Sequence, residues 1–222
     1  MTYGARLFLI ILAFQFLLAN PASLEFSIIP KIDCHDMNSN GYPDFIAVNS
    51  SASPRILYHL EFIQTGIIIL WEYSMPENKS GYFADMIIGD FDNDGSQELM
   101  AVAYQDEDQD IFYIFSTDTI GFNEDLPKVL GINNALKNIT QPRKLYAMSA
   151  DKMGRQLFLI TQSSPNRQIV ICEYMDGEIY RKGSYGNKFL NQSMGPLELS
   201  LGDFDGDGIE DIFILSNGQK PE

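Results

Sequence analysis

The chain is organised around the stretch GDFDGDGIEDIFIL at residues 202–215. Two further stretches repeat its pattern: GDFDNDGSQELMAV at residues 89–102 and DMNSNGYPDFIAV at residues 36–48. Each copy is an acidic loop that contains glycine and is followed at once by an apolar run of strand-forming residues. The recurrence indicates one local structure that is used three times.

The polar residues of these loops alternate in a way that suits bound calcium. Calcium takes about six to eight oxygen ligands, and a glycine at position six lets a short loop turn sharply enough to point them inward. We number each loop from its first aspartate and take donors from positions one, three, five, seven (backbone carbonyl) and nine. The candidate ligands are Asp36, Asn38, Asn40, Tyr42 and Asp44; Asp90, Asp92, Asp94, Ser96 and Glu98; and Asp203, Asp205, Asp207, Ile209 and Asp211. We expect about three calcium ions, bound least tightly in the first loop, because Asn38 and Asn40 are neutral.

Two other interpretations of the loops are an EF-hand and a set of ordinary turns. An EF-hand shares the first six positions but also needs a bidentate glutamate at position twelve and flanking helices. Position twelve is Ala47, Ala101 and Ile214 here, and the flanks are short apolar runs. Ordinary Asp/Gly turns are the alternative for any single loop. Three copies with the same donor positions favour a cation site, because carboxylates packed together without a cation repel one another.

The loop glycines recur with a regular period. Gly41, Gly95, Gly154 and Gly208 are spaced 54, 59 and 54 residues apart. Gly154 belongs to an altered copy that keeps Asp151 and the following apolar strand but has Ser149 and Met153 at positions one and five. We expect that unit to keep its architecture and to lack the metal. A period of about 50–60 residues with several strands in each is typical of a β-propeller or a similar array.

The apolar runs after the loops predict strands that are buried on both faces, since they are apolar at nearly every position. The expected strands are 26–29 or 31–34, 45–49, 55–62, 66–73, 84–89, 99–104, 111–116, 144–148, 157–161, 168–174, 178–182, 197–201 and 212–215. The polar stretch 118–141 carries weak strand signals and a helical turn near residues 132–137. We expect an all-β propeller of four-stranded blades, with units at about 24–80, 81–141 and 142–194 and an incomplete unit at 195–222.

The D-x-D-x-D-G loops and the strands that follow them resemble FG-GAP/VCBS repeats, best known from the propeller in the head of integrin α subunits. The likeness is nearer to the bacterial VCBS form and covers nearly all of the chain after the first 23 residues. It implies that each loop joins the first two strands of a blade and holds calcium. Propellers of this family close with about seven blades, so the units found here imply a partial ring. A truncated sequence is our first explanation; closure by self-association or an unusually small ring are the alternatives.

Charge and the N-terminal residues limit the location and the partners. The chain has 222 residues and a formal net charge of −15, which argues against nucleic acid and anionic membranes as partners. Residues 1–23 read as a secretory signal, with Arg6 before an apolar run from Leu7 to Ala19. An N-terminal membrane anchor is the alternative. We expect a secreted or cell-surface protein, periplasmic if bacterial, with no membrane insertion after signal cleavage.

Two cysteines, Cys34 and Cys172, are too few for a disulfide framework. Export permits one bridge between them, and buried free thiols are the alternative.

No catalytic set stands out, since the chain has neither a G-x-S-x-G nor an H-E-x-x-H motif. A structural role is favoured for both histidines, His35 and His59. The aromatic residues Trp71, Tyr73, Tyr82 and Phe83 could stack on sugars or pack in the core. We expect a non-enzymatic, calcium-stabilised module that binds an extracellular protein or glycan. The alternatives are an accessory or substrate-binding domain of a secreted polysaccharide-active enzyme and a structural spacer.

Overall fold

The computed structural model describes residues 36–38, 40–49, 55–79, 81–104, 110–118, 121–122, 127–131, 133–137, 139, 142–162, 168–185 and 198–215. The regular elements in these ranges are β-strands in four antiparallel sheets, which confirms the all-β expectation. No helix in the described ranges is long and apolar enough to cross a membrane. The expected signal at 1–23 and the first candidate strand, at 26–29 or 31–34, lie outside the described residues.

We number the sheets one to four in chain order. Sheet one contains β1 (Asp44–Asn49), β2 (Ile56–Ile63) and β3 (Gly66–Ser74). Sheet two contains β4 (Tyr82–Gly89), β5 (Glu98–Tyr104), β6 (Asp110–Asp118), β7 (Gly121–Phe122) and β8 (Lys128–Gly131). Sheet three contains β9 (Pro142–Ser149), β10 (Gln156–Gln162), β11 (Gln168–Met175) and β12 (Glu178–Tyr185). Sheet four contains β13 (Glu198–Gly202) and β14 (Asp211–Leu215).

Every strand expected within the described residues is present, with small differences at the ends. The stretch with weak strand signals forms β7 and β8, which both pair with β6. The helical turn expected nearby is a hydrogen-bonded turn at residues 134–137. Asn133 stabilises it, because its Oδ1 accepts hydrogen bonds from the backbone N–H groups of Ala135 (2.9 Å) and Leu136 (3.1 Å).

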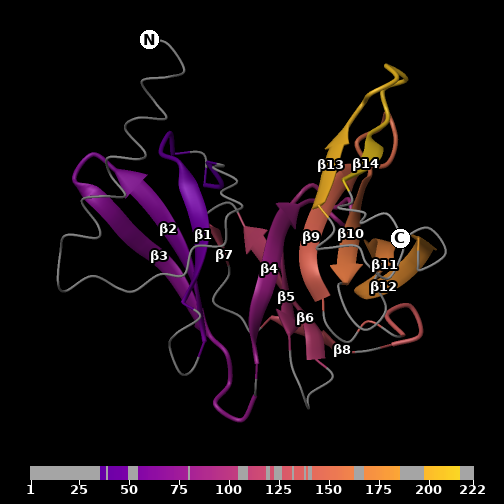
Figure 1. Ribbon diagram of the computed structural model, residues 1–222. Helices are drawn as coiled ribbons and strands as arrows, with labels where there is room; N and C mark the ends of the chain where they lie inside the picture. The colour runs from indigo at the N-terminus through magenta and orange to yellow at the C-terminus, as the bar shows by residue number, and fades with distance from the viewer. Residues whose placement is uncertain are drawn as a thin grey trace, which may run out of the picture.

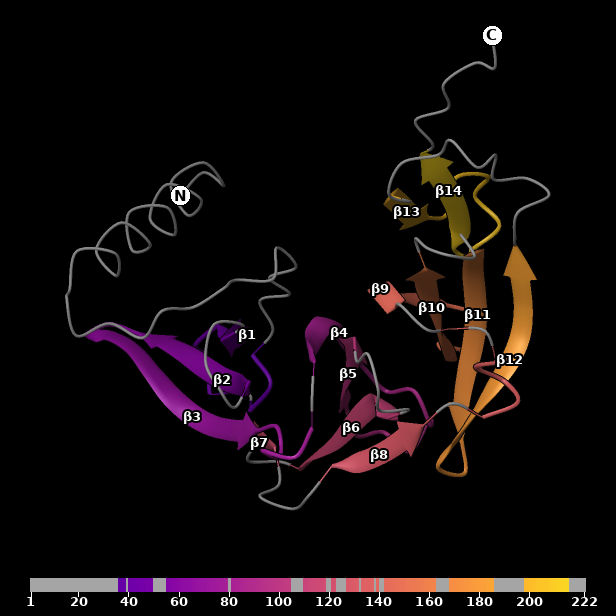
Figure 2. The same ribbon diagram turned by 60° about the horizontal axis from the view of Figure 1, so that its bottom comes forward.

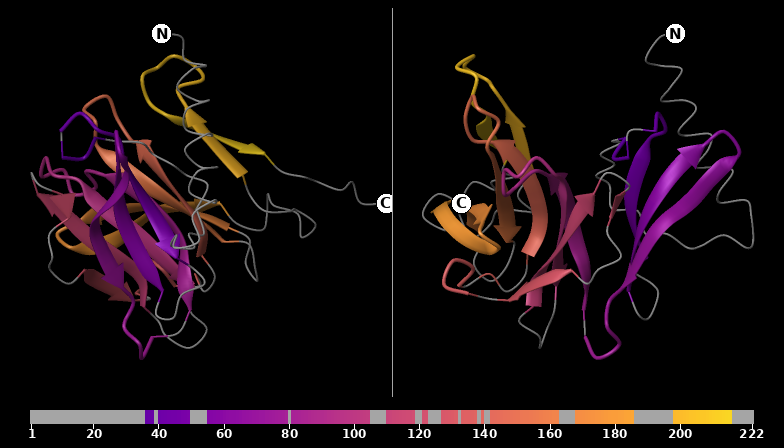
Figure 3. Two further views of the ribbon diagram at one scale, coloured as in Figure 1. Left: turned by 90° about the vertical axis from the view of Figure 1, so that its left-hand side faces the viewer. Right: turned by 180° about the vertical axis from the view of Figure 1, so that it is seen from behind.

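The sheets follow one another in chain order along an arc, with sheet one at one end and sheet four at the other (Figure 2). Figures 1 and 3 show the same succession from the front and from behind. In sheets two, three and four the strand before a loop pairs with the strand after it: β4 with β5, β9 with β10, and β13 with β14. The described arc does not close into a ring, so the propeller remains a prediction.

Neighbouring sheets pack face to face in a repeated manner. Continuing the loop numbering into the strand, positions ten and eleven are Phe45 and Ile46, Leu99 and Met100, Phe158 and Leu159, and Ile212 and Phe213. Leu99, Phe158 and Ile212 pack against the preceding sheet. Ile46, Met100 and Leu159 pack against the following sheet. Successive strand residues point to opposite faces, so each sheet turns equivalent faces to its two neighbours.

The core between sheets two and three is built around Phe158. Its side chain is fully buried and makes edge-to-face ring contacts with Phe91 and Phe112, at centroid distances of 5.9 and 5.7 Å. Asp85 on β4 accepts a hydrogen bond of 2.8 Å from the backbone N–H of Leu145 on β9. These two sheets are therefore joined by aromatic packing and by a buried polar contact.

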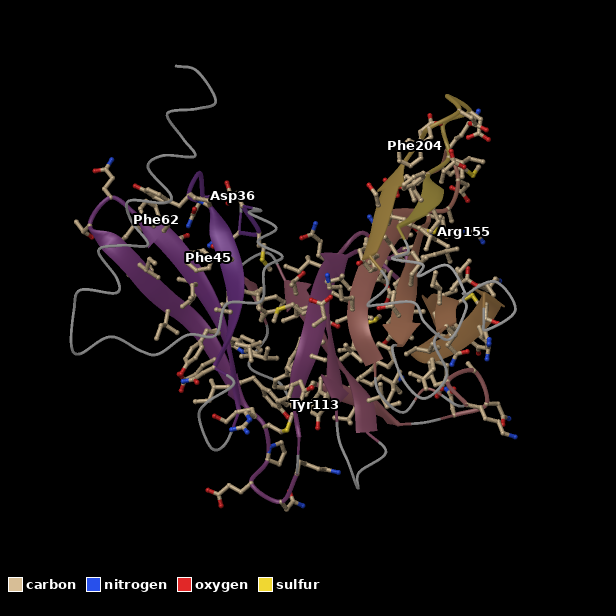
Figure 4. The ribbon with its side chains drawn as sticks, viewed as in Figure 1. Asp36, Phe45, Phe62, Tyr113, Arg155 and Phe204 are labelled. Carbon is tan, nitrogen blue, oxygen red and sulfur yellow. The ribbon has the colours of Figure 1, made fainter. Side chains whose placement is uncertain are left out.

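The core between sheets one and two takes up most of the aromatic residues that could have stacked on sugars. Trp71 lies 5.0 Å from the ring of Phe115, Tyr73 lies 5.0 Å from the same ring, and Phe83 lies 5.3 Å from Tyr113. Tyr113 is labelled in Figure 4 at this interface. Tyr82 differs from the others, since 43% of its surface is exposed.

Cys172 is a buried free thiol, and burial raises its pKa to about 12. Cys172 therefore agrees with the free-thiol alternative, while Cys34 lies outside the described residues.

Candidate metal sites

We call residues 36–44, 90–98, 149–157 and 203–211 the first, second, third and fourth loops. In three of them the carboxylate at position one accepts a hydrogen bond from the glycine N–H at position six. The pairs are Asp36 with Gly41 (2.7 Å), Asp90 with Gly95 (3.1 Å) and Asp203 with Gly208 (2.8 Å). These glycines have φ values of +90°, +91° and +84°. Residues with a side chain rarely adopt that conformation, which explains the glycine at position six.

Two more hydrogen bonds recur inside the same three loops. The N–H at position five donates to the side chain at position three, with distances of 3.1, 3.2 and 3.1 Å in the first, second and fourth loops. The N–H at position seven donates to the side chain at position five, with distances of 2.9, 2.7 and 2.8 Å. Tyr42, Ser96 and Ile209 are thus held by the residue two places before them.

Position nine closes each loop, because its carboxylate accepts a hydrogen bond from the N–H of position two. The pairs are Asp44 with Met37 (2.7 Å), Glu98 with Phe91 (2.9 Å) and Asp211 with Phe204 (3.1 Å). Position nine is also the first residue of β1, β5 or β14. The start of each loop is thereby tied to the start of the strand that follows it. Figure 4 labels Asp36 and Phe204 in the first and fourth loops, at opposite ends of the arc.

The second and fourth loops each gather carboxylates at close range. One carboxylate oxygen from each of Asp90, Asp92 and Asp94 lies within 4.8 Å of the others, and the same holds for Asp203, Asp205 and Asp211. In the part of the chain that the structure describes, these are the two groups of His, Cys, Asp or Glu side chains with such spacing. Asp207 is not a member of the fourth-loop group.

A buried oxygen of the second loop supports cation binding. Asp90 Oδ1 is buried, and among the described atoms it has no hydrogen-bond partner. Buried polar atoms of proteins nearly always have a partner, which can be an ion. Carboxylate oxygens are the ligands that calcium prefers, so the residues present fit a calcium ion.

The pKa of Glu98 reflects the same crowding. Burial and the charges of Asp92, Asp94 and Asp90 together raise this pKa to about 7, against the hydrogen bond from Phe91, which lowers it. Burial and the charge of Asp94 also raise the pKa of Asp92. A bound divalent cation would favour the charged carboxylates and reverse this effect.

The first loop uses a residue that the sequence analysis missed. The side-chain amide of Asn38 donates to Glu61 Oε2 at 3.3 Å, and the amide of Asn40 donates to the same oxygen. Glu61 is 4% exposed and stands opposite Asp44 in the pairing of β2 with β1. A signal was present, because Glu61 and His59 are charged or polar residues at alternate positions of an otherwise apolar strand. The first loop can therefore draw on a carboxylate from outside its own nine residues.

His59, on β2, is a second residue from outside the first loop that contacts it. It is 1% exposed, and its Nε2 lies 3.3 Å from Asp44 Oδ1. Its ring packs edge-on against Phe122 at 5.2 Å. Burial lowers the pKa of His59, although the neighbouring Asp44 opposes the shift. This contact supports a structural role for His59, whereas His35 lies outside the described residues.

No known protein family matches the sequence, and no curated protein matches it. Solved structures with a similar arrangement include the rhamnogalacturonan lyase PL11 of Bacillus licheniformis (TM-score 0.50, 14% identity), the exotype rhamnogalacturonan lyase YesX (0.50, 13%) and the rhamnogalacturonan lyase YesW (0.50, 14%). The alignments cover 85%, 87% and 86% of this chain but only 42%, 41% and 42% of those proteins. At such low identity the likeness shows a shared β-fold, and it carries no activity across.

Proposed function

We propose that this chain is a calcium-stabilised repeat module of a secreted or cell-surface protein, and that the module binds an extracellular protein or a glycan. The observation that carries the proposal is the hydrogen-bond pattern shared by the first, second and fourth loops. Calcium in the second loop would hold the end of β4 to the start of β5, and calcium in the fourth loop would do the same for β13 and β14. The first loop would bind more weakly, with Glu61 helping to compensate for its two asparagines.

We also propose that the sheets are successive blades of a propeller of the FG-GAP/VCBS kind. Support comes from the equivalent faces at positions ten and eleven. Phe91 and Met100 are 3% and 0% exposed between sheets two and three, whereas their equivalents in sheet four, Phe204 and Phe213, are 62% and 58% exposed. A further sheet, from a longer chain or from a second copy, would cover these two rings.

An accessory or substrate-binding domain of a polysaccharide-active enzyme is the second candidate. The observation in its favour is that the similar solved structures bear the names of rhamnogalacturonan lyases. Since the likeness supports the fold alone, its practical use is to choose a probe. Fluorescent rhamnogalacturonan oligosaccharides, tested by microscale thermophoresis with calcium and with chelator, would separate calcium-dependent glycan binding from none.

Calcium binding itself can be tested by calorimetric titration of the chain, with thermal unfolding followed in calcium and in chelator. We expect saturable binding and a melting temperature that falls by several degrees on chelation, because a ligand that binds only the folded state stabilises it. The double variant Asp92→Asn with Asp205→Asn should lose most of the binding. Asp176→Asn, in the exposed turn between β11 and β12, is the matched control and should bind like the parent. Parent protein that neither binds calcium nor changes its melting temperature would overturn the proposal.

A further inference from the structure

The third loop keeps its shape without the carboxylates that the other loops use. Ser149, Met153 and Leu157 stand at its positions one, five and nine. The N–H of Ala150, at position two, donates to the backbone carbonyl of Arg155 at 2.7 Å in place of a carboxylate at position nine. The N–H of Gly154, at position six, donates to the backbone carbonyl of Asp151 at 3.3 Å in place of a carboxylate at position one. Backbone oxygens thus replace two of the missing acceptors.

The third missing acceptor is the side chain at position five, and the carboxylate of Asp151, at position three, takes its place. Its Oδ1 accepts from the N–H of Met153 at 2.9 Å, as position three does in the other loops. The same oxygen also accepts from the N–H of Arg155 at 3.2 Å, which in the other loops would go to position five. Within the third loop, the Asp151 carboxylate thus accepts from two N–H groups, and its charge needs compensation. At the start of the loop the Ser149 N–H donates to Glu210 Oε2 of the fourth loop at 2.6 Å.

That compensation comes from Arg155, which Figure 4 labels beside sheet three. Its Nε lies 3.3 Å from Asp151 Oδ2, and its Nη1 lies 3.3 Å from Glu173 Oε1 on β11. Lys182 on β12 continues the series, with Nζ 2.9 Å from Glu173 Oε2. Glu173 is 8% exposed, so it is largely removed from water and gains most from its cationic partners.

We infer that the Arg155 guanidinium takes the place of a bound cation in the third loop, so that sheet three stays ordered when calcium is removed. A guanidinium is charged at any ordinary pH and can bridge two carboxylates. Sheet three lies between sheets two and four in the arc, and it would serve as the calcium-independent part of the chain. The expected difference in calcium dependence between the third loop and the other loops rests on the proposed function, whereas the role of Arg155 does not.

The test is amide hydrogen exchange on the full chain, in calcium and in chelator. We expect chelation to speed exchange about tenfold or more in residues 90–98 and 203–211 and to leave residues 150–157 unchanged within about twofold. Ser149 is left out because its N–H donates to Glu210 of the fourth loop. In Arg155→Gln, the backbone amides of residues 153 and 155 should exchange about tenfold faster than in the parent, both in calcium and in chelator. A lost charge-assisted contact is expected to have an effect of this size. Lys152→Gln removes a positive charge from the same loop outside this series and should leave those rates unchanged.

The outcomes separate the two ideas. If Arg155→Gln exchanges no faster than Lys152→Gln in chelator, or if chelation opens the third loop of the parent, the inference about Arg155 is wrong. If the exchange rates of residues 90–98 and 203–211 are the same in calcium and in chelator while Arg155→Gln still speeds exchange in the third loop, the calcium proposal is wrong and the role of Arg155 stands.

Discussion

Among single residues, Glu98 couples the acidic loops to pH. Burial and three nearby aspartates raise its pKa from 4.5 to about 7, so the folded chain holds a proton that the unfolded chain has released. The contribution of Glu98 to stability therefore falls as the pH rises from about 4.5 to about 7. In chelator we expect the parent to lose up to about 3 kcal/mol over this range relative to Glu98→Gln.

Urea unfolding at pH 5 and pH 7 measures this difference, and added calcium should remove it, because the cation favours the charged carboxylate. Identical pH dependence of parent and variant in chelator would show that Glu98 is ionised freely in the fold.

Glu61 is the residue on which the first loop depends. Glu61 is buried, and its carboxylate accepts hydrogen bonds from the side-chain amides of the half-buried Asn38 and the exposed Asn40. We expect Glu61→Ala to destabilise the chain by about 1–3 kcal/mol in urea unfolding, because two amide donors lose their acceptor. Glu72→Ala, on the neighbouring strand β3 with an exposed side chain, is the control and should change stability by less than about 0.5 kcal/mol. Equal effects of the two substitutions would contradict this account.

At the scale of one loop, the backbone conformation is the limiting feature. Gly95 has a φ of +91°, and a Cβ added there would meet no atom within 4 Å. The cost of Gly95→Ala is therefore conformational, and we expect a loss of about 1–2 kcal/mol in stability. Asn93 already has a φ of +65°, so Asn93→Gly should be neutral within about 0.5 kcal/mol. Thermal unfolding in chelator decides the point: a Gly95→Ala variant as stable as the parent would mean that the loop can rearrange.

At the scale of the whole molecule, the stability of the arc lies in the contacts between sheets. Phe158 is fully buried between sheets two and three, whereas Phe213 is 58% exposed. The ring centroid of Phe213 lies 6.0 Å from that of Phe204. We expect Phe158→Ala to cost about 3–5 kcal/mol of unfolding free energy, and Phe213→Ala to cost less than about 1 kcal/mol. Urea unfolding measures the free energy of unfolding of both variants and so compares the covered face of sheet three with the exposed face of sheet four. A large loss for Phe213→Ala would mean that sheet four is covered in solution, and sedimentation would then reveal self-association.

Local spacing along the chain was sufficient to predict much of this molecule. The order of Asp90, Asp92, Asp94 and Gly95 within a short loop already implied that the three carboxylates lie close together. Glu98 has the right spacing but is not a member of that group. The apolar runs after the loops predicted strands, and the structure confirms them as β1, β5, β10 and β14. The expected burial on both faces holds for β5 but not for β14, where Phe213 is 58% exposed. These features depend on residues close in sequence, whose geometry the backbone itself restricts.

Other features required contacts between residues far apart in sequence. Glu61 reaches the first loop only through the pairing of β1 with β2, and Arg155 meets Glu173 only because β10 pairs with β11. Asp207 has the right spacing yet stays outside the fourth-loop group. The packing of the sheets along an arc likewise decides that Phe91 is buried and that the equivalent Phe204 is exposed. Pairing register and sheet packing bring distant residues together, and neither can be read from spacing within a single repeat.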